Sequence, residues 1–206
     1  MKKEIKAVIF DLGGVVLSRG LWSFRAYLVE KYGVTDEQTR DVLIKKYYKS
    51  YFSGNMSEEE FWRGVLADLN IVTDWKELKA VLLDYYVPNE GMYELITDLR
   101  NKGYKTYLLS DQTNDWWPLL NERHHISDYF DRTFISAEIG FHKPEKVFYE
   151  FVLKNINFLA EEILFIDDLQ ENLDPASKLG MNVILYSTTE SLKKDLEDFG
   201  IYQRVD

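Results

Sequence analysis

Three apolar segments that lie far apart in this 206-residue chain end in acidic residues. These residues are Asp11, Asp111 and the pair Asp167 and Asp168. Ser110 stands directly before one of these acids, and Lys143 lies in the segment GFHKPEKVF. This set suits phosphate chemistry, because one carboxylate can attack phosphorus while other carboxylate and carbonyl oxygens hold Mg²⁺. Serine and lysine side chains can bind the remaining phosphoryl oxygens.

Each of these residues has a purely structural explanation when it is taken alone. An aspartate at a strand end is often a turn or helix cap, and a single lysine such as Lys143 is commonly a solvated surface residue. The adjacent acids Asp167 and Asp168 are harder to explain in this way, since neighbouring carboxylates repel unless a cation or a proton lies between them. The hypothesis of a phosphate site therefore depends on the whole set.

Five short apolar runs predict the strands that position these side chains. They are residues 6–11, 105–111, 132–136, 162–168 and 182–187. Such runs, separated by longer helical segments, are typical of parallel strands buried on both faces, and the helical segments are residues 89–102, 144–155 and 169–179. We predict an α/β fold with a doubly wound, Rossmann-like parallel sheet. Ligands bind beyond the carboxyl ends of such strands, so the acids there form one candidate site.

Residues 18–87 interrupt this pattern with three or four amphipathic helices and no convincing strand. The helical stretches are residues 20–32, 35–52, 57–69 and 74–86. Thr35 and the capping-box-like SEEE that starts at Ser57 mark helix beginnings. We therefore predict two domains, which are an α/β core over residues 1–17 and 88–206 and a helical cap over residues 18–87.

The predicted cap is rich in aromatic residues, most of which fit a helical period and are expected in its core. Arg19 and Trp22 are exceptions, because they follow the first strand closely and can reach the site. Trp116 and Trp117 are adjacent, so we expect one of them to line the pocket, the cap interface or a partner surface. The histidines lack the spacing of a metal site. We predict that His124 and His125 lie in a solvated loop, and we assign no role to His142.

Composition narrows the classes of function. A formal net charge of -10 argues against a nucleic-acid partner, and no run approaches the roughly 20 apolar residues that span a membrane. There are no cysteines, which excludes disulfides and thiolate chemistry and fits a cytoplasmic protein. The apolar stretch near the N-terminus runs into Asp11 without a cleavage site, so we interpret it as a strand and not a signal peptide.

Four motifs in order resemble those of the haloacid dehalogenase-like (HAD) hydrolase superfamily, in the phosphatase branch that carries a helical cap after the first motif. They are FDLGGVV (residues 10–16), LLSD (108–111), HKPEKVFY (142–149) and FIDDLQENLDPASKLGM (165–181). The branch includes sugar phosphatases and the N-domain of epoxide hydrolases. One such motif is weak, but four in order, with a helical insertion where the family has its cap, are specific.

The resemblance implies which residues handle the phosphoryl group of a small phosphorylated metabolite, such as a sugar phosphate. Asp11 would be the nucleophile that forms an aspartyl-phosphate, while Lys143 would orient Asp11 and, with Ser110, bind the phosphoryl group. The glycines after Asp11, which are Gly13 and Gly14, would leave backbone N–H groups open to phosphoryl oxygens. Asp111 stands where relatives commonly have Asn or Thr, and we expect it to be protonated or to bind a substrate hydroxyl.

For Mg²⁺, the resemblance implies a set of oxygen ligands from the same motifs. Asp168 takes the family position of a metal ligand, and Asp11 and the carbonyl of Gly13 would be ligands too. Asp167 would be a further ligand or, with Asn172, would support the ligands.

Gly13 departs from the family pattern, because most phosphatases of the superfamily have there a second Asp that acts as general acid and base. Loss of a general acid typically costs about 10²- to 10⁴-fold in rate. One interpretation is hydrolysis of a substrate with a good leaving group, or with a proton from water or from a cap residue.

Two other interpretations stay open. One is a metal-independent hydrolase of the 2-haloacid dehalogenase type, which also lacks the second Asp. The other is a catalytically weak binding or regulatory protein. Dehalogenases replace the acidic pair of the last motif, whereas Asp167 and Asp168 are both present here. The sequence therefore favours the Mg²⁺-dependent phosphomonoester hydrolase.

Overall fold

The computed structural model describes residues 3–203 and has a five-stranded sheet at its centre, so the first two and last three residues of the predicted core lie outside the described part. The strands are β1 (Ala7–Phe10), β2 (Lys105–Ser110), β3 (Arg132–Ile135), β4 (Ile163–Asp167) and β5 (Asn182–Leu185). They are all parallel, in the order β3-β2-β1-β4-β5. All five predicted strands and the doubly wound fold class are thus confirmed.

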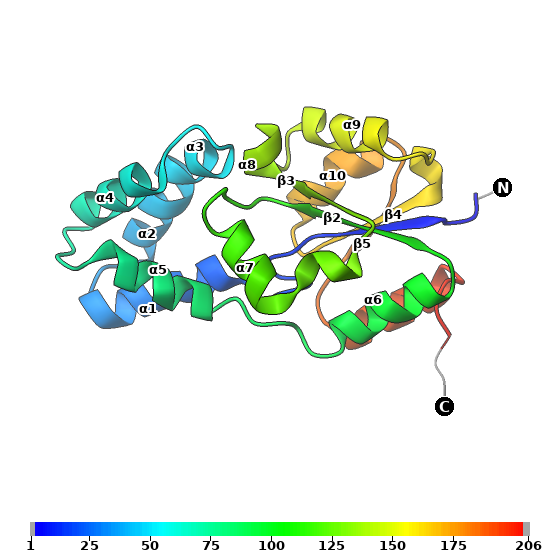
Figure 1. The fold of residues 1–206 in the computed structure, drawn as a ribbon, viewed down its shortest axis with the longest axis horizontal. Coiled ribbons are helices and arrows are strands. Elements are labelled where there is room, and N and C mark those ends of the chain that lie inside the picture. Colours follow the sequence, from blue (N-terminus) through cyan, green and yellow to red (C-terminus); the bar gives the residue numbers. More distant parts are fainter. Residues whose placement is uncertain (1–2, 204–206) are drawn as a thin grey trace.

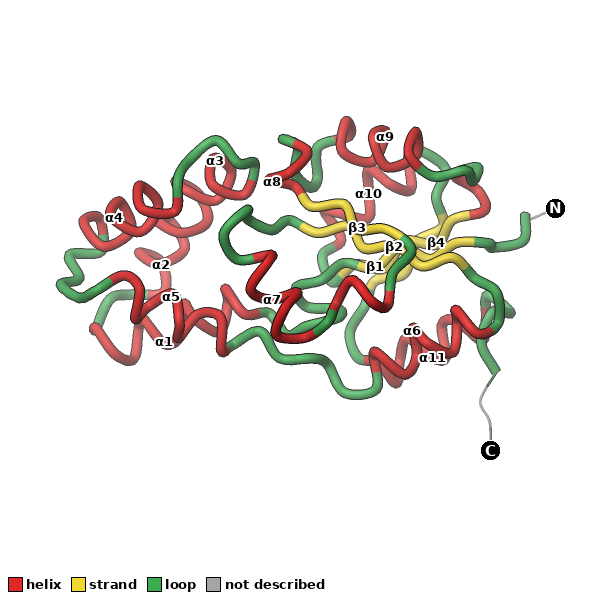
Figure 2. Tube along the Cα trace, viewed as in Figure 1, coloured by secondary structure: helices red, strands yellow, loops and turns green. Residues whose placement is uncertain are grey.

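Helices cover both faces of this sheet (Figures 1 and 2). Successive side chains of a strand point to opposite faces, so β1 sends Ala7 and Ile9 into one apolar cluster and Val8 and Phe10 into the other. Helices α9 (Lys146–Asn155) and α10 (Gln170–Lys178) cover the first face. Helices α6 (Met92–Asn101) and α11 (Thr189–Asp198) cover the second.

A group of helices is inserted between β1 and α6 and lies beyond one end of the sheet (Figure 1). Its members are α1 (Gly20–Tyr32), α2 (Asp36–Thr39), the π-helix η1 (Arg40–Tyr48), α3 (Lys49–Phe52), α4 (Glu58–Asp68) and α5 (Trp75–Asp84). The predicted starts are confirmed, since Thr35 and Ser57 both form capping boxes. The helix predicted over residues 35–52 forms as one run whose middle nine residues are π-helical.

The chain enters and leaves this insertion through two connections that are bonded to each other. The backbone N–H of Ser18 donates to the carbonyl of Val87 at 2.8 Å, and the N–H of Val87 donates to the Ser18 hydroxyl at 3.0 Å. Leu17 and Pro88 form an antiparallel bridge beside them. These bonds lie at the boundaries predicted for the cap. The division into a core and a cap stays a prediction, and we call residues 18–87 the cap below.

Trp116, which follows β2 in the chain, packs against the cap. Its side chain is fully buried against the cap aromatics Tyr51, Phe52, Phe61 and Trp62, with ring centroids 5.3 to 6.1 Å away. Its indole N–H donates to Glu58 at 3.0 Å. Of the three positions predicted for one tryptophan of the pair, which were the pocket, the cap interface and a partner surface, Trp116 takes the cap interface. Trp117 is buried as well, because its side chain packs in the same large apolar cluster.

Some short elements were not predicted from the sequence. They are α7 (Trp117–His124), α8 (Ser136–Ile139), α11, and the 3₁₀ turns η2 (Ile126–Tyr129) and η3 (Ala160–Glu162). The loop predicted for His124 is wrong: this residue ends α7, and its Nε2 is buried. His125 is exposed, with a left-handed φ of 51°. Within residues 3–203, no helix is both long and apolar enough to cross a membrane.

Candidate active site

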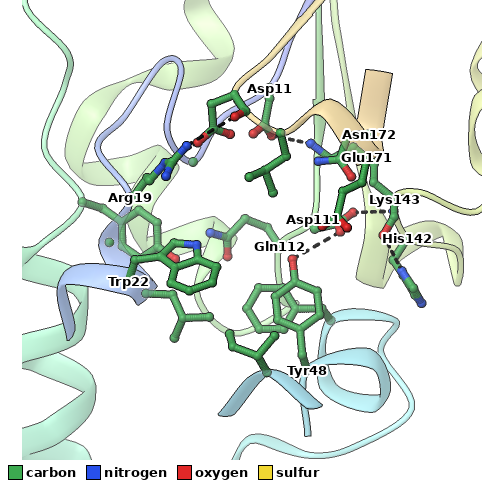
Figure 3. Close-up of a pocket in the computed structure, with 18 residues that line it drawn as sticks. Asp11, Arg19, Trp22, Tyr48, Asp111, Gln112, His142, Lys143, Glu171 and Asn172 are labelled. Atoms are coloured by element: carbon green, nitrogen blue, oxygen red, sulfur yellow. Dashed lines mark hydrogen bonds and ion pairs between the residues drawn. The ribbon is translucent and has the colours of Figure 1, made fainter. Parts of the chain in front are cut away.

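A cavity of about 250 Å³ lies at the carboxyl ends of the central strands, between the sheet and the cap (Figure 3). Phe10 at the end of β1 is in register with Ile166 of β4, so the next residues, Asp11 and Asp167, lie side by side. Asp111 follows β2, on the other side of β1. The parallel register therefore brings together acids that are more than 150 residues apart in the chain.

Lys143 lies between two of these acids. Its Nζ is 2.7 Å from Asp11 Oδ1 and 2.7 Å from Asp167 Oδ2, and its side chain is 2% exposed. Burial lowers the pKa of Lys143, but the carboxylates of Asp11 and Asp167 outweigh burial and hold this pKa well above its usual range. The lysine therefore stays cationic and fixes the Asp11 carboxylate.

Asp11 is buried and lines the cavity. Burial raises its pKa well above the usual range; Lys143 opposes this shift, and the charges of Asp167 and Asp168 add to it. An ionised Asp11 in this position gains from any further positive charge near it. A site with this property favours binding of a cation beside the carboxylate.

Asp167 has a full set of hydrogen-bond donors. The N–H of Leu169 donates to it at 2.9 Å, and the side-chain amide of Asn172 donates at 3.0 and 3.1 Å, in addition to Lys143. Asn172 is itself fixed, because the Tyr149 hydroxyl donates to its backbone carbonyl at 2.7 Å. Held by these bonds, Asp167 and Asn172 can keep Lys143 in position.

Asp168 has a different partner, the guanidinium of Arg19 at the start of the cap. Burial raises the pKa of Asp168, and the charge of Arg19 opposes that shift. Gly14 lies against the same carboxylate: it has a φ of +106°, and a Cβ there would collide with the side chain of Asp168. A glycine is therefore required at this position by both conformation and space.

The glycine N–H groups differ from the prediction at one position. The N–H of Gly14 donates to the carbonyl of Leu17 at 2.7 Å, so it is not free for a phosphoryl oxygen, and that predicted contact is wrong. This hydrogen bond closes the turn that follows β1. Gly13, by contrast, lines the cavity. A Cβ added at Gly13 would meet only Tyr86, at 3.9 Å, within 4 Å.

The acidic cluster has the composition of a divalent-cation site. One oxygen from each of Asp11, Asp167 and Asp168 lies within 4.8 Å of the other two. Carboxylate oxygens are the ligands that Mg²⁺ prefers. Because Asp167 is already satisfied by hydrogen bonds, the donor set fits a cation best through Asp11 and Asp168.

Asp111 connects the cap to the lysine segment. It accepts the backbone N–H of Lys143 at 2.9 Å and the hydroxyl of Tyr48, a cap residue, at 3.2 Å. Burial raises the pKa of Asp111, and the charge of Lys143 opposes the shift. Ser110, immediately before it, is buried and does not line the cavity, so its role in phosphate binding stays a prediction.

The cavity is closed on the cap side mainly by apolar and aromatic side chains. They are Leu21, Trp22, Ile44, Tyr48, Phe52 and Tyr86, with Arg19 at the edge. Only Arg19 and Trp22 were singled out from the sequence, because the other residues fit the helical period of a core. Gln112 and His142 line the opposite side; Gln112 directly follows Asp111, in a loop that sequence position alone could have indicated.

A parallel sheet with an acidic cluster and a buried lysine at its strand ends is an arrangement typical of α/β hydrolases. A sequence profile of the haloacid dehalogenase-like hydrolases matches residues 5–180. The chain therefore belongs to this family of hydrolases.

Similar proteins include named phosphatases. The chain is 30% identical over 193 residues to the D-ribitol-5-phosphate phosphatase of Bacteroides thetaiotaomicron, covering 85% of this chain and 89% of that protein. It is 28% identical over 186 residues to the sesquiterpene phosphatase astK of Aspergillus oryzae, covering 88% and 89%.

Solved structures share the fold. A HAD family enzyme from Bacteroides thetaiotaomicron has a TM-score of 0.76 at 23% identity, covering 94% of this chain and 99% of that one. An L-2-haloacid dehalogenase from Xanthobacter autotrophicus has a TM-score of 0.66 at 18% identity, covering 97% and 85%. The fold alone therefore does not distinguish a phosphatase from a dehalogenase. The side chains of the site have to make that distinction.

Proposed function

We propose that this protein is a Mg²⁺-dependent phosphomonoester hydrolase that acts through an aspartyl-phosphate at Asp11. The observation that supports the proposal most directly is the position of Lys143 Nζ, 2.7 Å from both Asp11 and Asp167, beside the carboxylate of Asp168. A lysine fixed in this way leaves one oxygen of Asp11 to attack and offsets the charge of an incoming dianion.

The reaction has two steps on Asp11. Its carboxylate forms a bond to phosphorus while the bond from phosphorus to the leaving oxygen breaks, and the electron pair of that bond stays with the leaving oxygen. Water then attacks the phosphorus of the aspartyl-phosphate, which releases inorganic phosphate and restores the carboxylate. Lys143 stabilises negative charge on the phosphoryl oxygens in both steps.

Magnesium would be held by Asp11 and Asp168, with the carbonyl of Gly13 as a further proposed ligand. Bound there, it would neutralise charge on the phosphoryl oxygens. The surplus of carboxylates around Lys143 is the feature that fits this ion. Solved relatives with the same fold include a HAD family enzyme in complex with magnesium and inorganic phosphate, at a TM-score of 0.72 and 23% identity.

The substrate we propose is a small phosphorylated metabolite, and the place of action is the cytoplasm. The cavity of about 250 Å³ supports a small leaving group. The names of the two phosphatase relatives, which concern ribitol 5-phosphate and sesquiterpenes, support a phosphorylated small molecule of either a polyol or an apolar kind.

A dehalogenase function is the second candidate, and the acidic pair argues against it. Attack on carbon with loss of halide needs no cation beside the nucleophile, yet one oxygen of Asp168 lies within 4.8 Å of oxygens of Asp11 and Asp167. A binding protein without turnover is the third, and Gly13 is its only support.

A phosphatase assay with and without EDTA tests the proposal. We expect Mg²⁺-dependent release of phosphate from a panel of phosphomonoesters, and we expect Asp11→Asn to abolish it. Asp131→Asn, which changes an acid far from the cavity, is the matched control and should stay active. Halide release from 2-haloacids in EDTA would instead support the dehalogenase, and the absence of both activities in the folded protein would support the binding protein.

A further inference from the structure

The wall of the cavity that faces the proposed phosphoryl site is built from the cap. In Figure 3, Trp22 and Tyr48 lie across the cavity from Asp11, the proposed nucleophile. When the phosphoryl group of a substrate is bound at Asp11, the rest of that substrate therefore extends toward the cap. The side chains of this wall then decide which leaving groups bind.

Most of this wall is apolar or aromatic, and packing holds it in place. Ile44 and Tyr48 lie four residues apart on the π-helix η1, and both line the cavity. π-Helices are rare and frequently occur at functional sites. The ring of Tyr48 stacks on that of Phe52, with centroids 4.1 Å apart and an angle of 12° between the planes. Phe52 and Leu21 are buried. The cap therefore presents a fixed apolar surface to the leaving group.

The carboxylate nearest to this wall is Asp111, and both of its oxygens already accept hydrogen bonds. Its Oδ2 accepts the hydroxyl of Tyr48 at 3.2 Å, and its Oδ1 accepts the backbone N–H of Lys143 at 2.9 Å. A sugar or polyol brings several hydroxyls, and each one that is buried without a hydrogen bond costs free energy. A polyol would have to compete with these contacts for a partner, whereas a hydrocarbon chain would leave them intact.

Trp22 is a large apolar residue of this wall that remains exposed. It lines the cavity and is 43% exposed, although burial of a tryptophan side chain is strongly favourable. The guanidinium carbon of Arg25 lies 4.7 Å from the centre of its ring. Arg25 is buried and donates to the Thr39 hydroxyl at 3.2 Å and to the Asp36 carboxylate at 2.7 Å. The indole is thus backed by a fixed cation and keeps apolar surface that a ligand can cover.

We propose that the substrate is a phosphomonoester of an apolar alcohol, whose hydrocarbon part packs against Trp22, Ile44 and Phe52. This inference rests on the proposed phosphatase function and selects the apolar kind of substrate over the polyol. The phosphoryl group fixes one end of the molecule at Asp11, so the wall contacts the carbons nearest to the ester oxygen. A cavity of about 250 Å³ has the volume of about eight water molecules, which is room for a phosphoryl group and a few carbons.

The test measures how straight-chain alkylphosphonates inhibit the hydrolysis of 4-nitrophenyl phosphate by the wild-type protein with Mg²⁺. These probes carry a carbon in place of the ester oxygen and are not hydrolysed, so the inhibition constant Ki reports binding alone. We expect Ki to fall about threefold for each methylene added from ethylphosphonate to pentylphosphonate. The compound 3,4-dihydroxybutylphosphonate adds two hydroxyls to butylphosphonate, and we expect it to bind about tenfold more weakly.

Trp22→Ala should weaken the binding of pentylphosphonate more than that of ethylphosphonate, so the advantage of the longer chain should fall about fivefold. Trp75→Ala is the matched control, because Trp75 is a half-buried cap tryptophan outside the lining of the cavity. It should leave the ratio of the two Ki values unchanged. Ile44→Asn is a second variant, which places an amide in the wall. It should shift the preference toward dihydroxybutylphosphonate.

A Ki that does not change with chain length, in a protein that hydrolyses 4-nitrophenyl phosphate, would overturn the inference and leave the proposed function standing. Tighter binding of dihydroxybutylphosphonate than of butylphosphonate would also overturn it, in favour of a polyol substrate. Equal changes of the ratio in Trp22→Ala and Trp75→Ala would overturn the contact with Trp22. If the folded wild type with Mg²⁺ does not hydrolyse 4-nitrophenyl phosphate, the proposed function fails and the inference with it.

Discussion

The guanidinium of Arg19 is ion-paired with the carboxylate of Asp168, 149 residues further along the chain, and its Nη2 donates to the backbone carbonyl of Asp168 at 3.3 Å. Arg19 is the second residue of the cap, whereas Asp168 directly follows β4. The pair therefore joins the entry of the cap to the acidic cluster. In this arrangement the guanidinium of Arg19 is paired with the carboxylate that we propose as a Mg²⁺ ligand.

Arg19→Met should make Mg²⁺ bind more tightly, because the ion no longer competes with the guanidinium for Asp168. The Arg19 side chain is 49% exposed, so we expect a gain of about 1 kcal/mol, near fivefold in affinity. Isothermal titration of Mg²⁺ into the protein without substrate measures it. Arg63→Met, which breaks a surface pair with Glu59, should leave the affinity unchanged. Weaker Mg²⁺ binding in Arg19→Met would mean that the arginine supports the site.

Gly14→Ala should lower both stability and Mg²⁺ affinity. Alanine at a positive φ costs about 1 kcal/mol, and at residue 14 its Cβ also collides with Asp168. Gly33→Ala isolates the first effect, because Gly33 has a φ of +70° and nothing within 4 Å of the added Cβ. Urea unfolding and Mg²⁺ titration of both variants check this. The explanation fails if the two variants unfold alike and bind Mg²⁺ alike.

Trp116→Ala should destabilise the protein by about 3 to 5 kcal/mol, the usual cost of removing a large aromatic side chain from a core. The substitution opens a cavity among the cap aromatics and removes the indole donor to Glu58. Trp22→Ala is the comparison, since Trp22 is 43% exposed, and its loss of stability should be small. Denaturant unfolding followed by circular dichroism gives both values. Similar losses in both variants would contradict this role of Trp116.

Acidification should destabilise the protein through His124. Burial lowers the pKa of His124 below its usual value of 6.5, the charge of Arg123 adds to this, and the backbone of Tyr86 opposes it. Below pH 6.5 the folded state then binds fewer protons than the unfolded state. The neutral imidazole therefore makes its full contribution to the free energy of unfolding above pH 6.5. That contribution is lost as the pH falls through the lower pKa of the folded state.

His124→Gln should weaken this pH dependence, because an amide does not titrate. Melting temperatures measured from pH 7 down to about pH 5 compare the two proteins, and the wild type should lose more over that range. His125→Gln is a suitable control, since His125 is 77% exposed on its side chain. An identical decline in wild type and His124→Gln would assign the effect to other groups.

Local sequence determined much of the fold. Each strand is a short apolar run, and a strand buried on both faces needs little else to be predicted. Thr35 and Ser57 mark helix starts because their capping boxes involve only residues three positions away. Helix α7 was missed because its eight residues begin with a tryptophan and a proline and show no clear period.

The sequence also determined which acids meet. Parallel strands end at one edge of a sheet, so Asp11, Asp111 and the acids at the end of β4 had to converge once the strands were correct. Tertiary structure decided the remaining contacts. The pairing of Arg19 with Asp168 and the position of the Tyr86 ring beside Gly13 depend on how the cap helices pack over the sheet. Those contacts join residues distant in the chain, and no spacing rule within one helix or strand encodes them.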